Sequence, residues 1–224
     1  MISTGNDIIS LNAINVARTK QPRFYSKILS GNERSLYDEP QFTAIPFEIF
    51  VWLLWSIKES AYKFLKRIDQ KLIFTPVKFE VTQLEIPAGF SIINFGQHET
   101  EGIGFADGSA LKGTIAIGTY KLYSRSLIYK QLILSVVDDN KNFDTTCWGI
   151  KSISSTAPDT QSAAVRGFLL NRLQNALGFK DITINKNPDG IPVLLQASKD
   201  TGIPVSLSHH DCVIAYCFKL ANQD

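Results

Sequence analysis

A glutamate and a lysine one helical turn apart stand in the most apolar region of the sequence. Glu59 and Lys63 lie within residues 45–68, where apolar residues recur at intervals of three and four. This spacing predicts a helix with one buried side, on which Glu59 and Lys63 share a face and Lys58 lies at its edge. Taken alone, the pair is typical of a solvated ion pair that stabilises a helix by roughly 0.3–0.5 kcal/mol.

A second carboxylate, Asp7, stands in a β-branched run that predicts a strand over residues 2–11. Aspartate is depleted in strands. Asp7 is therefore either a turn or cap residue or an acid with a chemical role, and the residues alone leave both interpretations open.

The second half of the chain offers a helix and a strand that carry further polar groups. Residues 161–177 have the apolar stripe of a helix, and this helix carries Arg166. Residues 205–210 predict a strand with Ser208 and His209 near its end. By itself, a histidine at a strand end is typical of a partly exposed surface residue.

Composition restricts the class of protein. The chain has 224 residues, of which 44% are apolar and 20% charged, as in soluble globular proteins. The net charge is +2 and no basic block occurs, so we expect no nucleic-acid partner. The apolar run at residues 45–55 is interrupted by Glu48 and is too short to span a bilayer, and no signal peptide is visible. The three cysteines lack metal-finger spacing and indicate reduced thiols in a cytoplasmic protein.

The order of elements predicts an α+β fold of two similar lobes, each a long helix packed on an antiparallel sheet. Short apolar or alternating runs between residues 71 and 137 predict strands. Residues 101–108 are rich in glycine, but they lack GxGxxG spacing and predict a hairpin tip rather than a phosphate loop. We place the lobes at residues 1–108 and 109–224, although no sequence repeat supports this division.

Four short motifs together resemble the 4′-phosphopantetheinyl transferases. The family pattern is a G-x-D strand, a W-x-x-K-E-x-x-x-K helix, a G-x-P turn and an S-x-S-H strand. The matching residues here are Gly5-Asn6-Asp7, Trp55 to Lys63, Gly190-Ile191-Pro192 and Ser206-Leu207-Ser208-His209. Residues 23–33 also look like the small holo-acyl-carrier-protein synthases, whereas residues 70–150 match no motif.

The order of the motifs distinguishes this chain within the family it resembles. The acidic motifs come first and the Ser-His motif last, as in the small synthases. The larger, surfactin-type members have the reverse order, yet the second half of this chain looks like their first lobe. We therefore interpret the chain as a two-lobed transferase with its lobes in permuted order.

The resemblance implies a phosphoryl-type transfer reaction. It implies that 4′-phosphopantetheine moves from coenzyme A to a serine of an acyl or peptidyl carrier protein, with Mg²⁺ and release of 3′,5′-ADP. Asp7 and Glu59 are implied as metal ligands, and Glu59 also as the base for the serine proton. Lys63 and His209 are implied as further catalytic residues.

The resemblance also implies a set of contacts to coenzyme A and a setting for the reaction. The contacting residues would be Arg166 at the 3′-phosphate, Ser208 and His209 at phosphate oxygens, Lys58 at the diphosphate, and Pro192 in the G-x-P turn. The expected setting is fatty acid or polyketide biosynthesis in the cytoplasm, by a monomer that binds neither nucleic acid nor membrane.

Two departures from the family pattern keep other functions open. Ile9 stands where surfactin-type members have an acid, and Ile191 replaces the lysine usual in the G-x-P turn. One alternative is therefore a non-catalytic member that binds coenzyme A or a carrier protein. Another is an unrelated metal-dependent hydrolase that uses Asp7 and Glu59.

Overall fold

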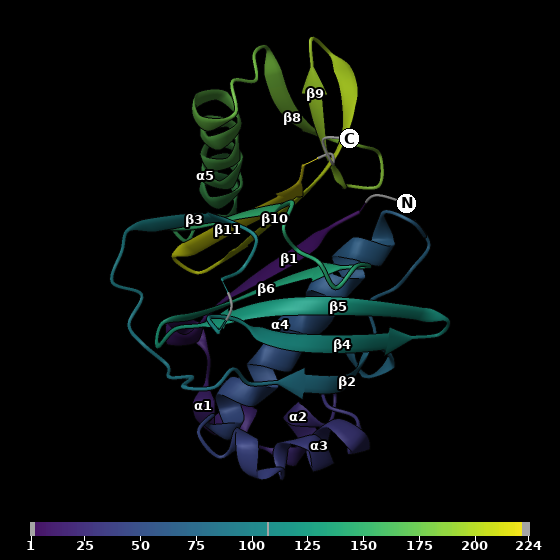
Figure 1. Cartoon of the computed structure of the whole chain (residues 1–224), viewed down its shortest axis with the longest axis vertical. Helices are drawn as coiled ribbons and strands as arrows, with labels where there is room; N and C mark the ends of the chain where they lie inside the picture. Colours follow the sequence, from purple (N-terminus) through teal and green to yellow (C-terminus); the bar gives the residue numbers. More distant parts are fainter. Residues whose placement is uncertain (1–2, 107, 221–224) are drawn as a thin grey trace.

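The computed structural model describes residues 3–106 and 108–220. These residues form two antiparallel sheets, each packed against one long helix (Figure 1). The five-stranded sheet has the order β1-β6-β5-β4-β2, and the six-stranded sheet has the order β3-β7-β11-β10-β9-β8. The predicted α+β class is therefore confirmed. The strands of the first sheet are β1 (Gly5–Ser10), β2 (Glu80–Glu85), β4 (Leu111–Ile117), β5 (Tyr120–Ile128) and β6 (Leu132–Asp138). Those of the second are β3 (Glu99–Ile103), β7 (Thr146–Ser152), β8 (Ile182–Lys186), β9 (Pro192–Gln196), β10 (Lys199–His210) and β11 (Val213–Lys219).

Helix α4 (Phe47–Lys66) is the predicted central helix, and it crosses one face of the five-stranded sheet (Figure 1). Its apolar residues at intervals of three and four form the stripe that the sequence predicts. Each fully buried Leu, Ile or Phe side chain contributes roughly 1.5–3 kcal/mol through the apolar surface removed from water. The core side chains of this stripe are Phe50, Val51, Leu53, Leu54, Ile57, Ala61, Phe64 and Leu65.

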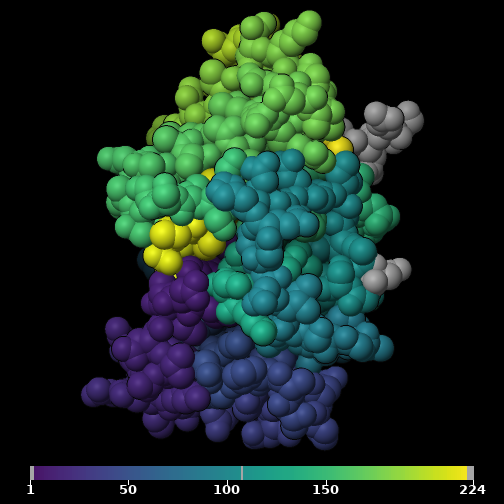
Figure 2. Space-filling model, turned by 90° about the vertical axis from the view of Figure 1, so that its left-hand side faces the viewer, coloured from purple at the N-terminus to yellow at the C-terminus, as the bar shows by residue number. Residues whose placement is uncertain are grey.

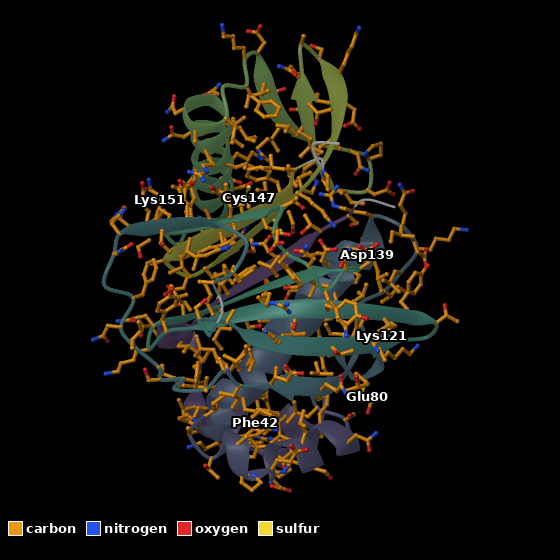
Figure 3. All side chains as sticks on the ribbon, in the orientation of Figure 1. Phe42, Glu80, Lys121, Asp139, Cys147 and Lys151 are labelled. Carbon is orange, nitrogen blue, oxygen red and sulfur yellow. The ribbon has the colours of Figure 1, made fainter. Side chains whose placement is uncertain are left out.

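Three short helices cover the N-terminal end of α4 (Figure 1): α1 (Val16–Thr19), α2 (Pro22–Tyr25) and α3 (Gly31–Tyr37). The fully buried ring of Phe42, labelled in Figure 3, packs against Phe50 of α4 at this end of the molecule.

The second long helix, α5 (Pro158–Asn171), packs on the six-stranded sheet through Val165, Phe168 and Leu169. A π-helical turn at Arg172–Ala176 continues it to the region where the sequence predicts its end. Each sheet thus has its own helix, although the two helices come from distant parts of the chain.

Strand β1 also lies beside β10, which joins the two sheets. The backbone N–H of Asn6 donates to Ser206 Oγ at 3.0 Å, and the backbone N–H of Ser10 donates to His210 Nδ1 at 2.9 Å. Residue 6 thus bonds to residue 206 and residue 10 to residue 210, so β1 and β10 run parallel. Side chains of β10, rather than a ladder of backbone hydrogen bonds, link the two strands. Figure 2 shows the yellow residues near position 210 in contact with the purple N-terminal region.

Sheet membership does not follow the expected boundary at residue 108. Strands β4–β6 join the first sheet, whereas β3 joins the second by pairing with β7. The predicted hairpin tip at residues 101–108 is therefore wrong, because the end of β3 and the connection to the other sheet occupy this segment. Residue 107 of this segment and residue 2 of the predicted first strand lie outside the described residues. The division of the chain into lobes at residue 108 stays a prediction.

No helix in the described part of the chain combines the length and the apolar character that a membrane crossing requires. The three cysteines are free thiols, with Cys147 and Cys217 buried and Cys212 partly buried.

Candidate functional site

Strand β1 and helix α4 approach so closely that only a glycine fits between them. A Cβ atom on Gly5 would lie 2.1 Å from the carbonyl oxygen of Ser60 and 2.7 Å from the amide nitrogen of Phe64. One pleat further along, Ser56 donates a hydrogen bond of 3.3 Å to the carbonyl oxygen of Asp7. This contact fixes Asp7 beside the middle of α4.

The carboxylates of Asp7 and Glu59 converge on the ammonium group of Lys63. The Nζ atom lies 3.0 Å from Asp7 Oδ1 and 3.4 Å from Glu59 Oε1. The second carboxylate oxygen of Glu59 accepts a hydrogen bond of 2.9 Å from the indole N–H of Trp55. Three of the predicted site residues therefore lie together, and their chemical roles stay a prediction.

The carboxyl group of Asp7 is enclosed and incompletely satisfied. Its Oδ2 atom is buried and has no hydrogen-bond partner among the described residues. Burial raises the pKa of Asp7 to about 7; Lys63 opposes this rise and Glu59 adds to it. Burial by itself would lower the pKa of Lys63, but the two carboxylates raise it. A buried carboxyl group with a free oxygen can take either a proton or a cation.

The acidic pair fits a hard divalent cation as part of a ligand set. Within residues 3–106 and 108–220, no three His, Cys, Asp or Glu side chains are grouped closely enough to hold a metal ion on their own. Mg²⁺ prefers oxygen ligands and keeps water and substrate phosphates in its shell, so two carboxylates suffice. The free Oδ2 of Asp7 favours a cation here. Ile9, at the position of the acid in surfactin-type members, is buried in the core and adds no ligand.

A cleft of about 280 Å³ opens beside Lys63 and is lined by both halves of the molecule. Its single lining carboxylate in the described residues is Asp189. An excess of cations in a partly enclosed cleft suits a ligand with several phosphate groups. The cations are Lys63, Lys66 and Arg67 at the C-terminal end of α4, Arg166 of α5 and Lys186 of β8.

Three of the predicted coenzyme A contacts lie in this cleft: Arg166, Pro192 and His209. The Arg166 side chain is partly exposed and has no hydrogen bond or ion pair among the described residues, so its guanidinium is available to a ligand. Partial burial, with the charges of Lys63 and Lys186, lowers the pKa of His209. The imidazole is therefore neutral near pH 7.

Lys58 does not reach the cleft, contrary to the interpretation of its sequence position. Its fully buried ammonium group lies 2.6 Å from Glu33 Oε2 and also donates to the carbonyl oxygen of Ile28. Consecutive residues of an α-helix point about 100° apart. Glu59 therefore reaches Lys63, which lines the cleft, while Lys58 points beneath α3 and pairs with Glu33.

Ser208 is likewise turned away from the cleft. Its Oγ atom accepts a hydrogen bond of 2.7 Å from Asn6 Nδ2, and the side chain is buried. Successive side chains of a strand face opposite sides, so Ser208 faces β1 while His209 faces the cleft. In this structure Ser208 joins the two sheets and makes no part of the cleft lining.

Sequence reasoning missed three cations of the cleft: Lys66, Arg67 and Lys186. Lys66 and Arg67 follow Lys63 within the next helical turn, so the helical pattern could have placed Arg67 on the same face. Lys186 has no comparable signal, because its position depends on how β8 packs beside α5.

No curated protein and no solved structure gave a match to this chain. The model of the 4′-phosphopantetheinyl transferase superfamily matches residues 3–102, the segment that contains Asp7, α4 and the acidic pair. The resemblance seen in the sequence is therefore confirmed over this range, which is a little less than half of the chain.

Proposed function

We propose that this protein transfers 4′-phosphopantetheine from coenzyme A to a serine of an acyl or peptidyl carrier protein. The observation that supports this proposal most directly is that Lys63, which contacts both Asp7 and Glu59, lines the same cleft as the further cations. Coenzyme A carries a diphosphate and a separate 3′-phosphate, so its charges match a cleft with cations on several elements.

In the proposed reaction the serine oxygen attacks the phosphorus that carries pantetheine. The bond from this phosphorus to the 5′-phosphate oxygen of the nucleotide breaks, and 3′,5′-ADP leaves with the bonding electron pair. Glu59 takes the serine proton, since its carboxylate is partly exposed beside the cleft and is oriented by Trp55. Lys63 offsets the charge that develops on the leaving phosphate.

The remaining groups bind and orient the nucleotide. Arg166 presents a planar guanidinium to the 3′-phosphate, and neutral His209 can exchange hydrogen bonds with phosphate oxygens. Mg²⁺ held by Asp7 and Glu59 would neutralise the diphosphate. Because one chain supplies both the acidic cluster and the cationic lining, we propose that a cytoplasmic monomer is sufficient for the reaction.

The test is the mass of a carrier protein after incubation. Several apo-acyl and apo-peptidyl carrier proteins are incubated with the enzyme, coenzyme A and Mg²⁺, and intact-protein mass spectrometry follows the reaction. We expect one phosphopantetheine group per carrier and release of 3′,5′-ADP. The same carriers with their acceptor serine changed to alanine should gain nothing.

The variant Glu59→Gln tests the assignment of the base. It retains the size of the side chain and its hydrogen bond with Trp55, so we expect a folded protein with transfer reduced at least about a hundredfold. Exposed Glu85→Gln is the matched control and should transfer at the wild-type rate. An undiminished rate for Glu59→Gln would remove Glu59 from this role.

The absence of a third acid favours one alternative function. With Ile9 in the core and Ile191 in the cleft lining, a member that binds coenzyme A or a carrier protein without turnover is the second candidate. Binding of coenzyme A together with unmodified mass for every carrier would support it. Hydrolysis of coenzyme A in the absence of a carrier would instead indicate a metal-dependent hydrolase.

A further inference from the structure

Arg67 lies on the same face of α4 as Glu59 and Lys63. Glu59, Lys63 and Arg67 are spaced by four residues, and Arg67 has helical backbone angles directly after the last residue of α4. Residues four apart lie on the same side of a helix. The guanidinium of Arg67 therefore leaves the helix toward the six-stranded sheet, on the side of the cleft.

The donors of Arg67 bind backbone rather than an acid. Its Nη2 atom donates to the carbonyl oxygen of Pro192 at 3.0 Å and also to the carbonyl oxygen of Val205. No carboxylate lies within ion-pair distance of it in the described part of the chain. Pro192 ends the G-x-P turn, and Val205 precedes the strand segment that presents His209.

These two carbonyl groups are held to the first half of the molecule in different ways. The segment around Val205 is also linked to β1, because Ser206 accepts the N–H of Asn6. The segment 187–196 has no other hydrogen bond to residues 3–106 among the hydrogen bonds of the described residues. Arg67 is thus the polar connection between the helix of the acidic cluster and the G-x-P turn.

Arg67 also forms part of the wall of the cleft. It lines the cleft on one side, and on the other it lines a separate cavity of about 210 Å³ together with Ser3, Val193 and Asp200. The side chain therefore contributes to the walls of both the cleft and this cavity.

We propose that Arg67 is a positioning residue that sets the placement of the nucleotide-binding turn relative to Glu59 and Lys63. This inference rests on the proposed transferase function for its kinetic consequence, but not for its structural one. In the proposed function, nucleotide binding relies on Arg166, Lys186 and His209 of the second half, and the hydrogen bonds of Arg67 go to Pro192 and Val205 instead. In-line attack requires both halves in register, because a small misplacement of reacting groups costs much of the rate.

The kinetic test compares Arg67→Met, which keeps a long apolar stem, with Arg67→Lys, which keeps the charge and some donors. For Arg67→Met we expect kcat to fall at least about tenfold while the Kd for coenzyme A, measured by calorimetry without carrier, changes less than about threefold. Arg67→Lys should recover part of kcat with the same Kd. Exposed Lys71→Ala should match the wild type in both quantities.

Two kinetic outcomes would overturn the inference. A kcat of Arg67→Met within about twofold of the wild type would show that the connection does not align the reactants. A Kd weakened at least about tenfold, restored in Arg67→Lys and accompanied by an unchanged kcat at saturation, would show a direct phosphate contact instead.

Hydrogen–deuterium exchange tests the connection without any turnover. Loss of the side chain should speed amide exchange in residues 187–195 and 203–207 of Arg67→Met, while α5 keeps the wild-type protection. Unchanged exchange in these segments would refute the positioning role. If the wild type transferred nothing to any carrier, the proposed function would fail, and the exchange experiment would still decide whether Arg67 holds the turn.

Discussion

The ammonium nitrogen of Lys63 lies 3.0 Å from Oδ1 of Asp7, although the two residues are 56 positions apart in the chain. This ion pair joins a strand residue to a helix residue that lines the cleft. Asp7 retains one buried oxygen without a partner, so Lys63 compensates its charge only in part. The site therefore holds a carboxyl group whose ionisation stays costly unless a second cation joins Lys63.

The stability of the metal-free protein should fall as the pH rises from about 4 to about 7. Asp7 has a pKa of about 7 in the folded protein and an ordinary value of 3.8. Between these values the folded state binds more protons than the unfolded state, so the free energy of unfolding decreases with increasing pH. The two pKa values differ by about three, and each pKa unit corresponds to about 1.4 kcal/mol, which gives a loss of up to about 4 kcal/mol.

Urea unfolding in the presence of a chelator, at a series of pH values, measures this loss. The variant Asp7→Asn has no proton to lose and should show a flatter profile than the wild type. Equal slopes for both proteins over this range would contradict the account of Asp7.

Replacing Lys63 by methionine should separate catalysis from nucleotide binding. The variant loses the charge that we propose offsets the leaving phosphate, and we expect kcat to fall about a hundred- to a thousandfold. The Kd for coenzyme A should weaken much less, because Lys66, Arg166 and Lys186 keep the cleft positive. Single-turnover transfer to a carrier protein measures the first quantity and calorimetry the second. Exposed Lys78→Met is the control, and a variant at Lys63 with wild-type kcat would exclude its proposed role.

The sequence predicted the elements whose signal is local. The stripe of α4 is set by apolar residues within a few turns, and Asp7 is marked by its presence in a β-branched run. Strand β3 could not be assigned to the second sheet, because its pairing with β7 joins residues about 50 positions apart. The cationic cleft was incompletely predicted for the same reason, since Lys186 and Arg166 meet only through the packing of β8 and α5.

Lys58 shows where the motif resemblance and the geometry separate. The motif places Lys58 and Glu59 together, but neighbouring helical residues point in different directions, and Lys58 instead fills a buried polar site under α3. Glu33 takes part in the capping box of α3, and its carboxylate accepts a hydrogen bond from the backbone N–H of Val81. The same carboxylate forms the ion pair with Lys58. A tertiary contact 25 residues away therefore decides the role of this lysine.

Lys58→Met should consequently destabilise the fold without weakening coenzyme A binding. Both side chains of the Lys58–Glu33 pair are fully buried, and removal of one partner leaves an uncompensated charge at a cost of about 3–5 kcal/mol. Urea unfolding measures the loss. Lys20→Met breaks the more exposed ion pair with Glu48 and should cost less than about 1 kcal/mol. A stable Lys58→Met protein with reduced affinity for coenzyme A would support the original motif-based role.

Gly5→Ala should damage both stability and transfer, because it separates the two elements that carry the acidic pair. The added methyl group would lie 2.1 Å from the carbonyl oxygen of Ser60 and 2.7 Å from the amide nitrogen of Phe64, both of which are backbone atoms of α4. The helix must move away from β1, and overpacking of this kind costs about 3 kcal/mol or more. Asp7 would then no longer lie at ion-pair distance from Lys63, so the transfer rate of the folded fraction should fall as well.

The matched change for this prediction is Gly167→Ala on helix α5. An added Cβ atom there meets no heavy atom within 4 Å, and the residue lies within a helix. Alanine is favoured over glycine in a helix interior, so this variant should gain about 0.5–1 kcal/mol and keep the wild-type transfer rate. Thermal unfolding and transfer to a carrier protein are measured on both variants. Wild-type stability and rate for Gly5→Ala would mean that the close approach of β1 to α4 does not hold the acidic pair in place.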